Sequence, residues 1–294
     1  MARIAAAAYP LCNLVDWAAY EAKLTLWIDD AAAQGAELLL FPEYSGAELA
    51  TLGNGPWGED HFAAIDAITA RLERANAFLA GLAQSRKVFL LSGSAAIRDG
   101  DQIINRAFFM TPGGDIAPVD KLMPTRWERE ALGMVGGAAP TLFETPLGKI
   151  GTAICYDCEF PLITRAMVEA GAEILLVPSC TETLAGYSRV KIGAMARALE
   201  SQCWAIHAPL IGDNDWAEMV AENTGAAAIY GPPDTGFPPT GITAGAKIDE
   251  PGWTIADCDP AAVHLVRREG SVMNWADWDQ QDGRLSAITQ RKFA

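Results

Sequence analysis

The sequence predicts an α/β fold in which helices cover layered β-sheet. Short apolar runs alternate along the chain with stretches whose apolar residues recur at helical spacing. Helical patterns lie toward both ends of the chain, on either side of a middle part rich in strand and turn signals. Because each sheet face needs helical cover, this order indicates helices packed on sheets, either around one doubly wound sheet or outside two stacked sheets.

The N-terminal part contains three predicted strands and two predicted helices. Asp16 precedes the first helical pattern as an N-cap residue, and Gly35 follows that pattern at the position where a helix often ends in a left-handed residue. The expected strands cover residues 4–9, 37–41 and 88–93, and the expected helices cover residues 17–34 and 63–84.

Turn signals divide the β-rich middle of the chain into hairpins. Pro-Gly-Gly at 112–114 separates two apolar runs, and Pro-Leu-Gly at 146–148 separates another two. The expected strands cover residues 105–111, 116–121, 141–144 and 149–154.

Two helix–strand pairs follow, and then a part rich in Gly and Pro. Residues 212–252 predict turns and a hairpin, and residues 275–279, with two tryptophans, predict an extended arm that docks onto another surface. No repeat, low-complexity segment or linker interrupts the pattern, so we expect one domain over residues 1–280 and a C-terminal extension over 281–294. The expected helices cover 162–170 and 187–202, the expected strands 173–178 and 203–208, and the last regular elements 253–256 and 263–267.

The charge balance excludes some classes of partner. The chain has 22 Lys and Arg residues against 37 Asp and Glu residues, a net charge of −15 that repels phosphate backbones and anionic lipid. We therefore expect no nucleic-acid and no membrane partner, and no apolar run reaches the roughly 20 residues that span a bilayer. The six cysteines are spread through apolar runs, as is typical of reduced thiols. Because Pro10 breaks the apolar start, we expect no cleaved signal peptide and a cytoplasmic protein.

Cys155 and Cys158 lie three positions apart at the end of a predicted strand, in G-T-A-I-C-Y-D-C-E-F-P. A dithiol redox motif normally begins a helix, and the neighbouring Asp157 and Glu159 would raise a thiol pKa rather than lower it. A zinc site needs three or four ligands, and the sequence has no second C-x-x-C and no H-x-x-x-H. The pattern favours either two buried bystanders or one nucleophile at a strand-to-loop corner.

A thiol nucleophile needs a base and a group that stabilises an oxyanion. His207 lies in the strand-like context A-I-H-A-P, which is typical of core histidines. Glu43 follows one predicted strand and Lys121 ends another. Glu128 or Glu130 follows in a turn that contains an aromatic residue. Taken alone, each of these Glu and Lys residues is typical of a charged residue on a protein surface. Together with the thiol, however, the carboxylate and the lysine all lie at carboxyl ends of predicted strands, where sites assemble in layered α/β folds.

Three ordered motifs resemble the nitrilase superfamily of carbon–nitrogen hydrolases. They are F-P-E at 41–43, D-K-L-M-P-T-x-x-E at 120–128 and I-C-Y-D-x-x-F-P at 154–161. The resemblance covers nearly the whole chain and implies a four-layer α-β-β-α sandwich of two mixed β-sheets. Supporting matches are Asn105 before a strand, Gly-Ala at 171–172, Pro-Ser at 178–179 and Arg-Ala at 197–198.

The resemblance also implies a Glu-Lys-Cys triad that needs no metal and no cofactor. Glu43 corresponds to the general base, Lys121 to the residue that stabilises the oxyanion, and Cys155 to the nucleophile. Glu128, rather than Glu130, corresponds to the family's second glutamate, which helps to position substrate and lysine.

The implied reaction is hydrolysis of a small linear amide or an N-carbamoyl compound through an acyl-thioester. Glu43 takes the thiol proton, and Lys121 with the backbone N–H of Tyr156 holds the oxyanion. The expected partners are the amide substrate, water and further copies of the chain in a homodimer or larger homo-oligomer. Nitrile hydrolysis, acyl transfer to an amine, and a catalytically silent binding or scaffold protein are the alternatives.

Departures from the family pattern lie on the substrate side. Many members have Arg where this chain has Glu159, a change from cation to anion if that residue faces the pocket. Thr181 and Glu182 follow the Pro-Ser motif and are expected to line the pocket. C-Y-D at the nucleophile resembles the amidase and carbamoylase branches, whereas nitrile hydrolysers more often have C-W-E, so amides are favoured over nitriles.

Overall fold

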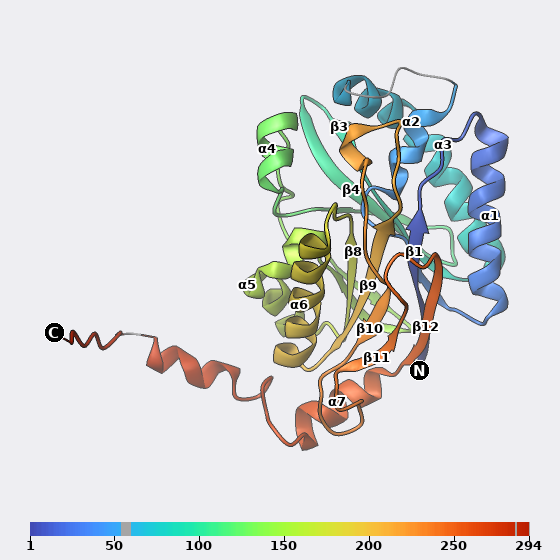
Figure 1. The fold of residues 1–294 in the computed structure, drawn as a ribbon. Coiled ribbons are helices and arrows are strands. Elements are labelled where there is room, and N and C mark those ends of the chain that lie inside the picture. Colours follow the sequence, from blue (N-terminus) through green and yellow to red (C-terminus); the bar gives the residue numbers. More distant parts are fainter. Residues whose placement is uncertain (54–59, 286, 294) are drawn as a thin grey trace.

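The structure is a computed structural model that describes residues 1–53, 60–285 and 287–293. In these ranges, the predicted strands and helices follow one another in the expected order, and further short helices over 48–51 and 126–132 lie among them (Figure 1). The strands are β1 (Ala2–Pro10), β2 (Leu38–Leu40), β3 (Phe89–Asp99), β4 (Gln102–Met110), β5 (Ile116–Asp120), β6 (Leu142–Thr145), β7 (Gly148–Thr152), β8 (Ile174–Ser179), β9 (Trp204–Ile211), β10 (Ala228–Tyr230), β11 (Ile242–Gly245) and β12 (Gly252–Cys258). The α-helices are α1 (Trp17–Ala33), α2 (Glu48–Thr51), α3 (His61–Arg86), α4 (Arg126–Leu132), α5 (Pro161–Glu169), α6 (Leu184–Ser201) and α7 (Pro260–Glu269). The 3-10 helices are η1 (Ser45–Ala47), η2 (Cys155–Glu159), η3 (Glu218–Val220) and η4 (Trp278–Arg284).

The strands form two halves that meet at one point. The first half has the order β5-β4-β3-β2-β1-β12, and the second has the order β6-β7-β8-β9-β10-β11. The halves join where Tyr9 and Pro10 of β1 pair with Leu210 and Ile211 of β9. In each half the three central strands are parallel and the outer pairs are antiparallel. Both halves are therefore mixed sheets, as expected.

Strand β1 shows how the layers are built. Successive side chains of a strand point to opposite faces. Ala7 and Tyr9 pack in one core with Ile28 of α1, and α3 contributes to the same core. Ile4 packs in a second core with Leu175 of β8, to which α5 and α6 also contribute. Helices α1 and α3 thus cover the first half, and α5 and α6 lie beside the second (Figure 1).

Two local predictions differ from the structure. The expected turn around Glu128 is the helix α4, because Thr125 and Glu128 form a reciprocal capping box at its start. The expected extended arm over 275–279 is instead a turn that leads into η4. The expected division between a domain over 1–280 and an extension over 281–294 stays a prediction, and η4 continues across that point. Residues 286 and 294 of the expected extension lie outside the described residues.

The ends of other elements follow the sequence closely. Asp16 caps α1 by accepting the Ala19 N–H at 2.8 Å, and Gly35 after this helix has a φ of 81°. Among the helices in the described ranges, none is both long enough and apolar enough to cross a membrane.

Candidate active site

Four segments meet at the carboxyl ends of β2, β5, β7 and β8. Glu43 follows β2, Lys121 directly follows β5, Cys155 begins η2 after β7, and Cys180 directly follows β8. Parallel strands bring their carboxyl ends to one edge of a sheet, which is where sites of α/β proteins form. The polar side chains that the sequence singled out are therefore gathered by the topology.

Glu43 lies in a tight turn that is packed against β3. A Cβ atom at Gly93 would lie 2.4 Å from the Pro42 carbonyl oxygen and 2.0 Å from the Ser45 hydroxyl, and Gly93 itself has a φ of 75°. Only glycine fits there, because both the space and the left-handed backbone exclude a side chain. Close approach of the two backbones buries Glu43 to 1% exposure.

Lys121 lies between two buried carboxylates. Its Nζ donates to Glu43 Oε1 at 2.7 Å and to both carboxylate oxygens of Glu128, at 2.9 and 2.7 Å. The lysine is 2% exposed. Burial alone would lower the pKa of Lys121, but the two carboxylates raise it above its ordinary value, so the ammonium form persists across the physiological range.

Glu128 is held by groups from three directions. Its Oε2 accepts the Thr125 N–H at 2.6 Å as part of the capping box. Its Oε1 accepts the Tyr44 hydroxyl at 2.6 Å and the Asn105 amide at 3.3 Å. Asn105 also donates to Glu43 Oε1 at 2.9 Å, so one amide bridges both carboxylates. These contacts fix the orientation of each carboxylate relative to Lys121.

The two carboxylates titrate in opposite directions. Burial raises the pKa of Glu43, and the nearby Glu128 raises it further, although Lys121 opposes both. Burial also acts to raise the pKa of Glu128, but its two bonds from Lys121 lower that pKa overall. Pairs of acids whose environments separate their pKa values are typical of sites in which one acid moves a proton and the other stays charged. Here Glu43 is the proton-moving candidate.

Cys155 lies in a strained turn. Its φ of 50° is in the left-handed region, which non-glycine residues seldom adopt. Its Sγ contacts the Cys180 carbonyl oxygen at 3.7 Å, and the Cys180 N–H donates to Glu43 Oε2 at 3.0 Å. Burial raises the pKa of the Cys155 thiol well above its ordinary value, and the Glu43 carboxylate raises it further. The sulfur is therefore a neutral thiol at neutral pH and needs a base before it can attack.

Asp157 ties the Cys155 turn to the Lys121 segment. Its carboxylate accepts the Leu122 N–H at 3.1 Å and the Met123 N–H at 2.7 Å, directly after Lys121. It also accepts the Ile154 N–H at 3.1 Å, directly before the thiol. One buried side chain therefore fixes the backbone on both sides of the site.

Replacing Asp157 with alanine is expected to lower the free energy of unfolding by about 3 kcal/mol, because several buried N–H groups would lose their acceptor. Urea denaturation of Asp157→Ala against the wild type measures this, with the exposed Asp101→Ala as the matched control. A loss no larger than that of the control would show that water replaces the carboxylate without cost.

A cavity of about 530 Å³ opens beside the thiol. Of the predicted site residues, Glu43, Lys121, Glu128, Cys155, Tyr156, Glu159, Thr181 and Glu182 all line it, together with Tyr44, Thr125, Arg126, Trp127, Cys180, Thr183, Gly186, Arg189, Val190 and Met219. The Thr181 hydroxyl donates to the Thr224 carbonyl at 3.0 Å, so its contribution to the wall is chiefly its carbon atoms. Glu130 is not part of this lining and instead pairs with Arg126 at 2.8 Å.

One cysteine and one histidine that the sequence analysis considered, Cys158 and His207, lie outside the cavity. Cys158 is fully buried against α6, where its Sγ contacts the Val190 carbonyl oxygen at 3.6 Å. His207 is a fully buried core residue, bonded to the Ser179 hydroxyl at 2.8 Å and stacked on Tyr187. Across the described residues, no group of three or more His, Cys, Asp or Glu side chains is arranged to hold a metal ion.

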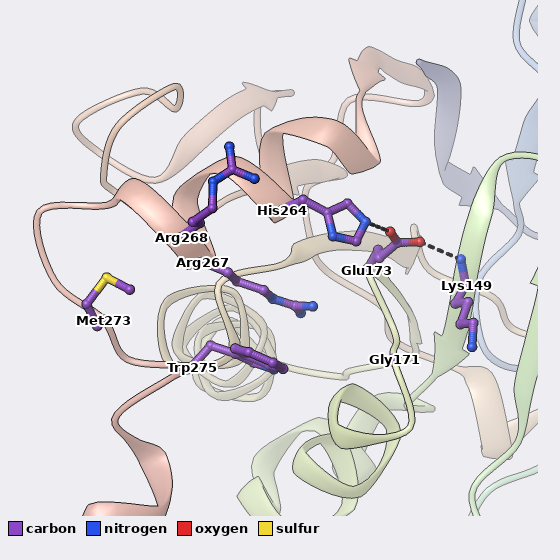
Figure 2. Close-up of a pocket in the computed structure, with 8 residues that line it drawn as sticks. All are labelled: Lys149, Gly171, Glu173, His264, Arg267, Arg268, Met273 and Trp275. Atoms are coloured by element: carbon purple, nitrogen blue, oxygen red, sulfur yellow. Dashed lines mark hydrogen bonds and ion pairs between the residues drawn. The ribbon is translucent and has the colours of Figure 1, made fainter.

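A larger hollow of about 660 Å³ lies at the opposite edge, where β7 and β8 begin (Figure 2). Its charged groups are engaged in holding the fold. Arg267 donates to two backbone carbonyl oxygens at the end of α6 and to the Ala172 carbonyl oxygen before β8, and it stacks on Trp275 at 5.2 Å. Glu173 accepts the backbone N–H of Lys149 at 2.8 Å and contacts His264. This hollow lies between the starts of β7 and β8 on one side and α7 with the C-terminal segment on the other, and none of the predicted site residues lines it.

Tyr44, Asp157 and the Cys180 backbone are site components that sequence reasoning missed, and Asn105 was noted only as a motif match. Tyr44 directly follows the F-P-E motif, and Asp157 is the Asp of C-Y-D, so the first adjoins a quoted motif and the second lies within one. Their partners are 84 and 35 residues away in the chain, and only the fold reveals such pairs.

Comparison with known proteins gives consistent matches. A family model described as carbon-nitrogen hydrolase matches residues 3–268. A probable hydrolase of Bacillus subtilis, YhcX, is 27% identical over 94% of this chain and 53% of its own length. A deaminated glutathione amidase of Synechocystis is 28% identical over 82% of this chain and 86% of its own. The chain spans about half the length of several curated relatives that it matches.

The solved structures agree in fold. The crystal structure of an amidase from Nesterenkonia sp. superimposes with a TM-score of 0.71 at 23% identity. That match covers 90% of this chain and 92% of the amidase chain. At this level of identity the likeness shows the α/β fold.

Proposed function

Since this chain belongs to the carbon–nitrogen hydrolase family, we propose that it hydrolyses the C–N bond of a small linear amide or N-carbamoyl compound. The observation that supports this most directly is the Lys121 ammonium, held between two buried carboxylates beside a thiol that lines the cavity. In this proposal Cys155 is the nucleophile, Glu43 the general base and Lys121 the oxyanion stabiliser.

The first half of the reaction uses Glu43 as base. Its Oε2 accepts the Cys180 N–H and keeps lone-pair capacity for the thiol proton. As that proton moves to Glu43, the Cys155 sulfur forms a bond to the amide carbon, and the carbonyl electrons move onto the oxygen. The resulting tetrahedral intermediate collapses when Glu43 gives the proton to the leaving nitrogen, and the C–N bond breaks. Ammonia or an amine departs, and a thioester remains on Cys155.

Lys121 stabilises the oxyanion by exchanging one hydrogen bond. Its three N–H donors are all taken by Glu43 and Glu128, and Glu128 receives two of them. Glu128 can release one donor to the oxyanion and still hold the lysine through the other. The Tyr156 N–H, in the first turn of η2, is the second donor in this proposal. A water molecule activated by Glu43 then attacks the thioester, which releases the acid and restores the thiol.

A screen for released ammonia or amine tests this reaction. Amides, N-carbamoyl amino acids and nitriles are compared, with Cys155→Ala as the blank. We expect turnover of at least one amide or carbamoyl compound that depends on Cys155. Turnover confined to nitriles, or equal turnover in the blank, would contradict the proposal. Added hydroxylamine separates hydrolysis from acyl transfer, because transfer yields a hydroxamate.

The pH dependence of kcat/KM is expected to have an acid limb above pH 4.5, the ordinary pKa of a glutamate. Glu43 must be ionised to accept the thiol proton, and its pKa is raised by burial, so activity falls as the pH drops through that raised value. Steady-state rates with one amide across the acid range measure this limb. A limb at or below pH 4.5 would mean that another group limits the reaction.

A second copy of the chain is the proposed protein partner. Apolar side chains on α5 and α6 face solvent in the isolated chain, and they are Leu162 (75% exposed), Leu184 (57%), Ile192 (67%) and Leu199 (41%). Exposed apolar residues gathered on neighbouring helices are typical of protein–protein contacts. Light scattering of the whole chain is expected to give at least twice the mass of one chain, and a single-chain mass at micromolar concentration would contradict this.

A further inference from the structure

Glu159 and Arg189 form a loose charge pair on the wall of the catalytic cavity. Glu159 belongs to η2, four residues after the thiol, and Arg189 belongs to α6. Arg189 Nε lies 3.8 Å from Glu159 Oε1, which is too long for a hydrogen bond. The Arg189 side chain is 65% exposed and the Glu159 side chain 25% exposed. Such a half-exposed pair holds its partners only weakly.

Glu159 is largely buried on the cavity wall and still has unused hydrogen-bonding capacity, unlike the buried Glu43 and Glu128 and the exposed Glu182. Glu43 and Glu128 each accept three or more hydrogen bonds. Within the described part of the chain, Glu159 accepts none, although burial raises its pKa and Arg189 only partly offsets this. Because the Glu159 side chain lines the cavity and is 25% exposed, its carboxylate can accept hydrogen bonds from a ligand that enters the cavity.

The charges around the cavity favour a cationic donor. Four carboxylates line it, from Glu43, Glu128, Glu159 and Glu182, against three cations, from Lys121, Arg126 and Arg189. Lys121 is saturated by the catalytic carboxylates, and Arg126 is paired with Glu130 outside the lining. Arg189 is the remaining cation, and its exposure leaves it free to swing toward water.

We propose that the substrate carries a primary ammonium group, which Glu159 binds in place of Arg189. This inference rests on the proposed function for the position of the reacting amide, and it adds the charge of the group beyond it. An ammonium has three donors on a point charge, which suits a carboxylate that lacks any donor. The overall charge of −15 also draws cations toward the chain.

Binding of three matched amides tests this proposal. Pentanamide, ω-aminopentanamide and glutaramate have the same chain length and end in a methyl, an ammonium and a carboxylate group. Calorimetry with the Cys155→Ala variant measures their dissociation constants without turnover, so the result does not depend on whether hydrolysis occurs. We expect ω-aminopentanamide to bind on the order of ten-fold more tightly than pentanamide, and glutaramate more weakly than both.

Variants at Glu159 separate recognition from a structural effect. In the Cys155→Ala background, Glu159→Gln is expected to lower the ammonium preference by on the order of ten-fold, and Glu159→Arg to reverse it in favour of glutaramate. Glu21→Gln on α1 removes the same charge far from the cavity and should leave the preference unchanged. Equal binding of the three amides, tighter binding of glutaramate, or an unchanged preference in Glu159→Gln would each overturn the proposal. Failure of the ammonia screen, by contrast, would count against the proposed reaction and not against this preference.

Discussion

Replacement of Cys155 by alanine is expected to abolish amide hydrolysis, with a fall in kcat of roughly ten-thousand-fold or more. The proposed reaction stores the acyl group on this sulfur, and no other side chain takes the same position. Cys180 also lines the cavity, but its Sγ donates to Asn223 Oδ1 at 3.1 Å, and burial raises its pKa well above its ordinary value. Ammonia release under saturating substrate measures the loss.

Cys158→Ala is the matched control for this prediction. It removes a thiol three positions away that packs against α6 outside the cavity. The Cys158→Ala variant is expected to keep kcat near that of the wild type. Full activity in Cys155→Ala, or an equal loss in both variants, would contradict the role proposed for Cys155.

Replacement of Lys121 by methionine is expected to lower kcat by roughly a thousand-fold and to destabilise the fold by about 3 to 5 kcal/mol. The kinetic loss follows from removing the proposed oxyanion donor. The loss of stability follows from burial, because Glu43 and Glu128 would face each other without the cation that now lies 2.7 Å from each. Assays of ammonia release measure the loss of kcat, and urea denaturation measures the loss of stability.

A second substitution distinguishes these effects. Adding Glu128→Gln to Lys121→Met removes one of the two unpaired charges, so it should recover part of the lost stability and none of the activity. Lys247→Met on the surface, where the side chain is 87% exposed, is the control for the change of residue type. Recovery of activity in the double variant, or a stability loss in Lys121→Met no larger than in the control, would contradict the placement of Lys121 between two charged carboxylates.

The order of elements could be predicted because apolar periodicity records it directly. Alternating and helical patterns place the predicted strands and helices within a few residues of β1, α1, α3, β8 and β9. The helix α4 was missed although Thr125 and Glu128 carry the T-x-x-E pattern of a capping box. Seven residues are too few for apolar periodicity to reveal a helix, so the capping residues were the available signal.

The residues of the candidate site could also be predicted only in part. The motifs and their spacing predict four site residues, and all four line one cavity in the structure: Glu43, Lys121, Glu128 and Cys155. The support from Tyr44 and Asn105 depends on side chains that meet across separate strands and helices, for which a single sequence carries no spacing signal. The same holds for Arg189, whose approach to Glu159 depends on how α6 packs on η2.

Mass spectrometry of the chain during a single turnover tests the proposed acyl-thioester most directly. Wild-type chain is mixed with a hydrolysed amide, quenched in acid within the first turnover, and digested. We predict a mass increase equal to the acyl group, located on the peptide that contains Cys155 and released as the acid forms. An acyl group on a different residue, or an unmodified chain throughout the turnover, would contradict a covalent mechanism at Cys155.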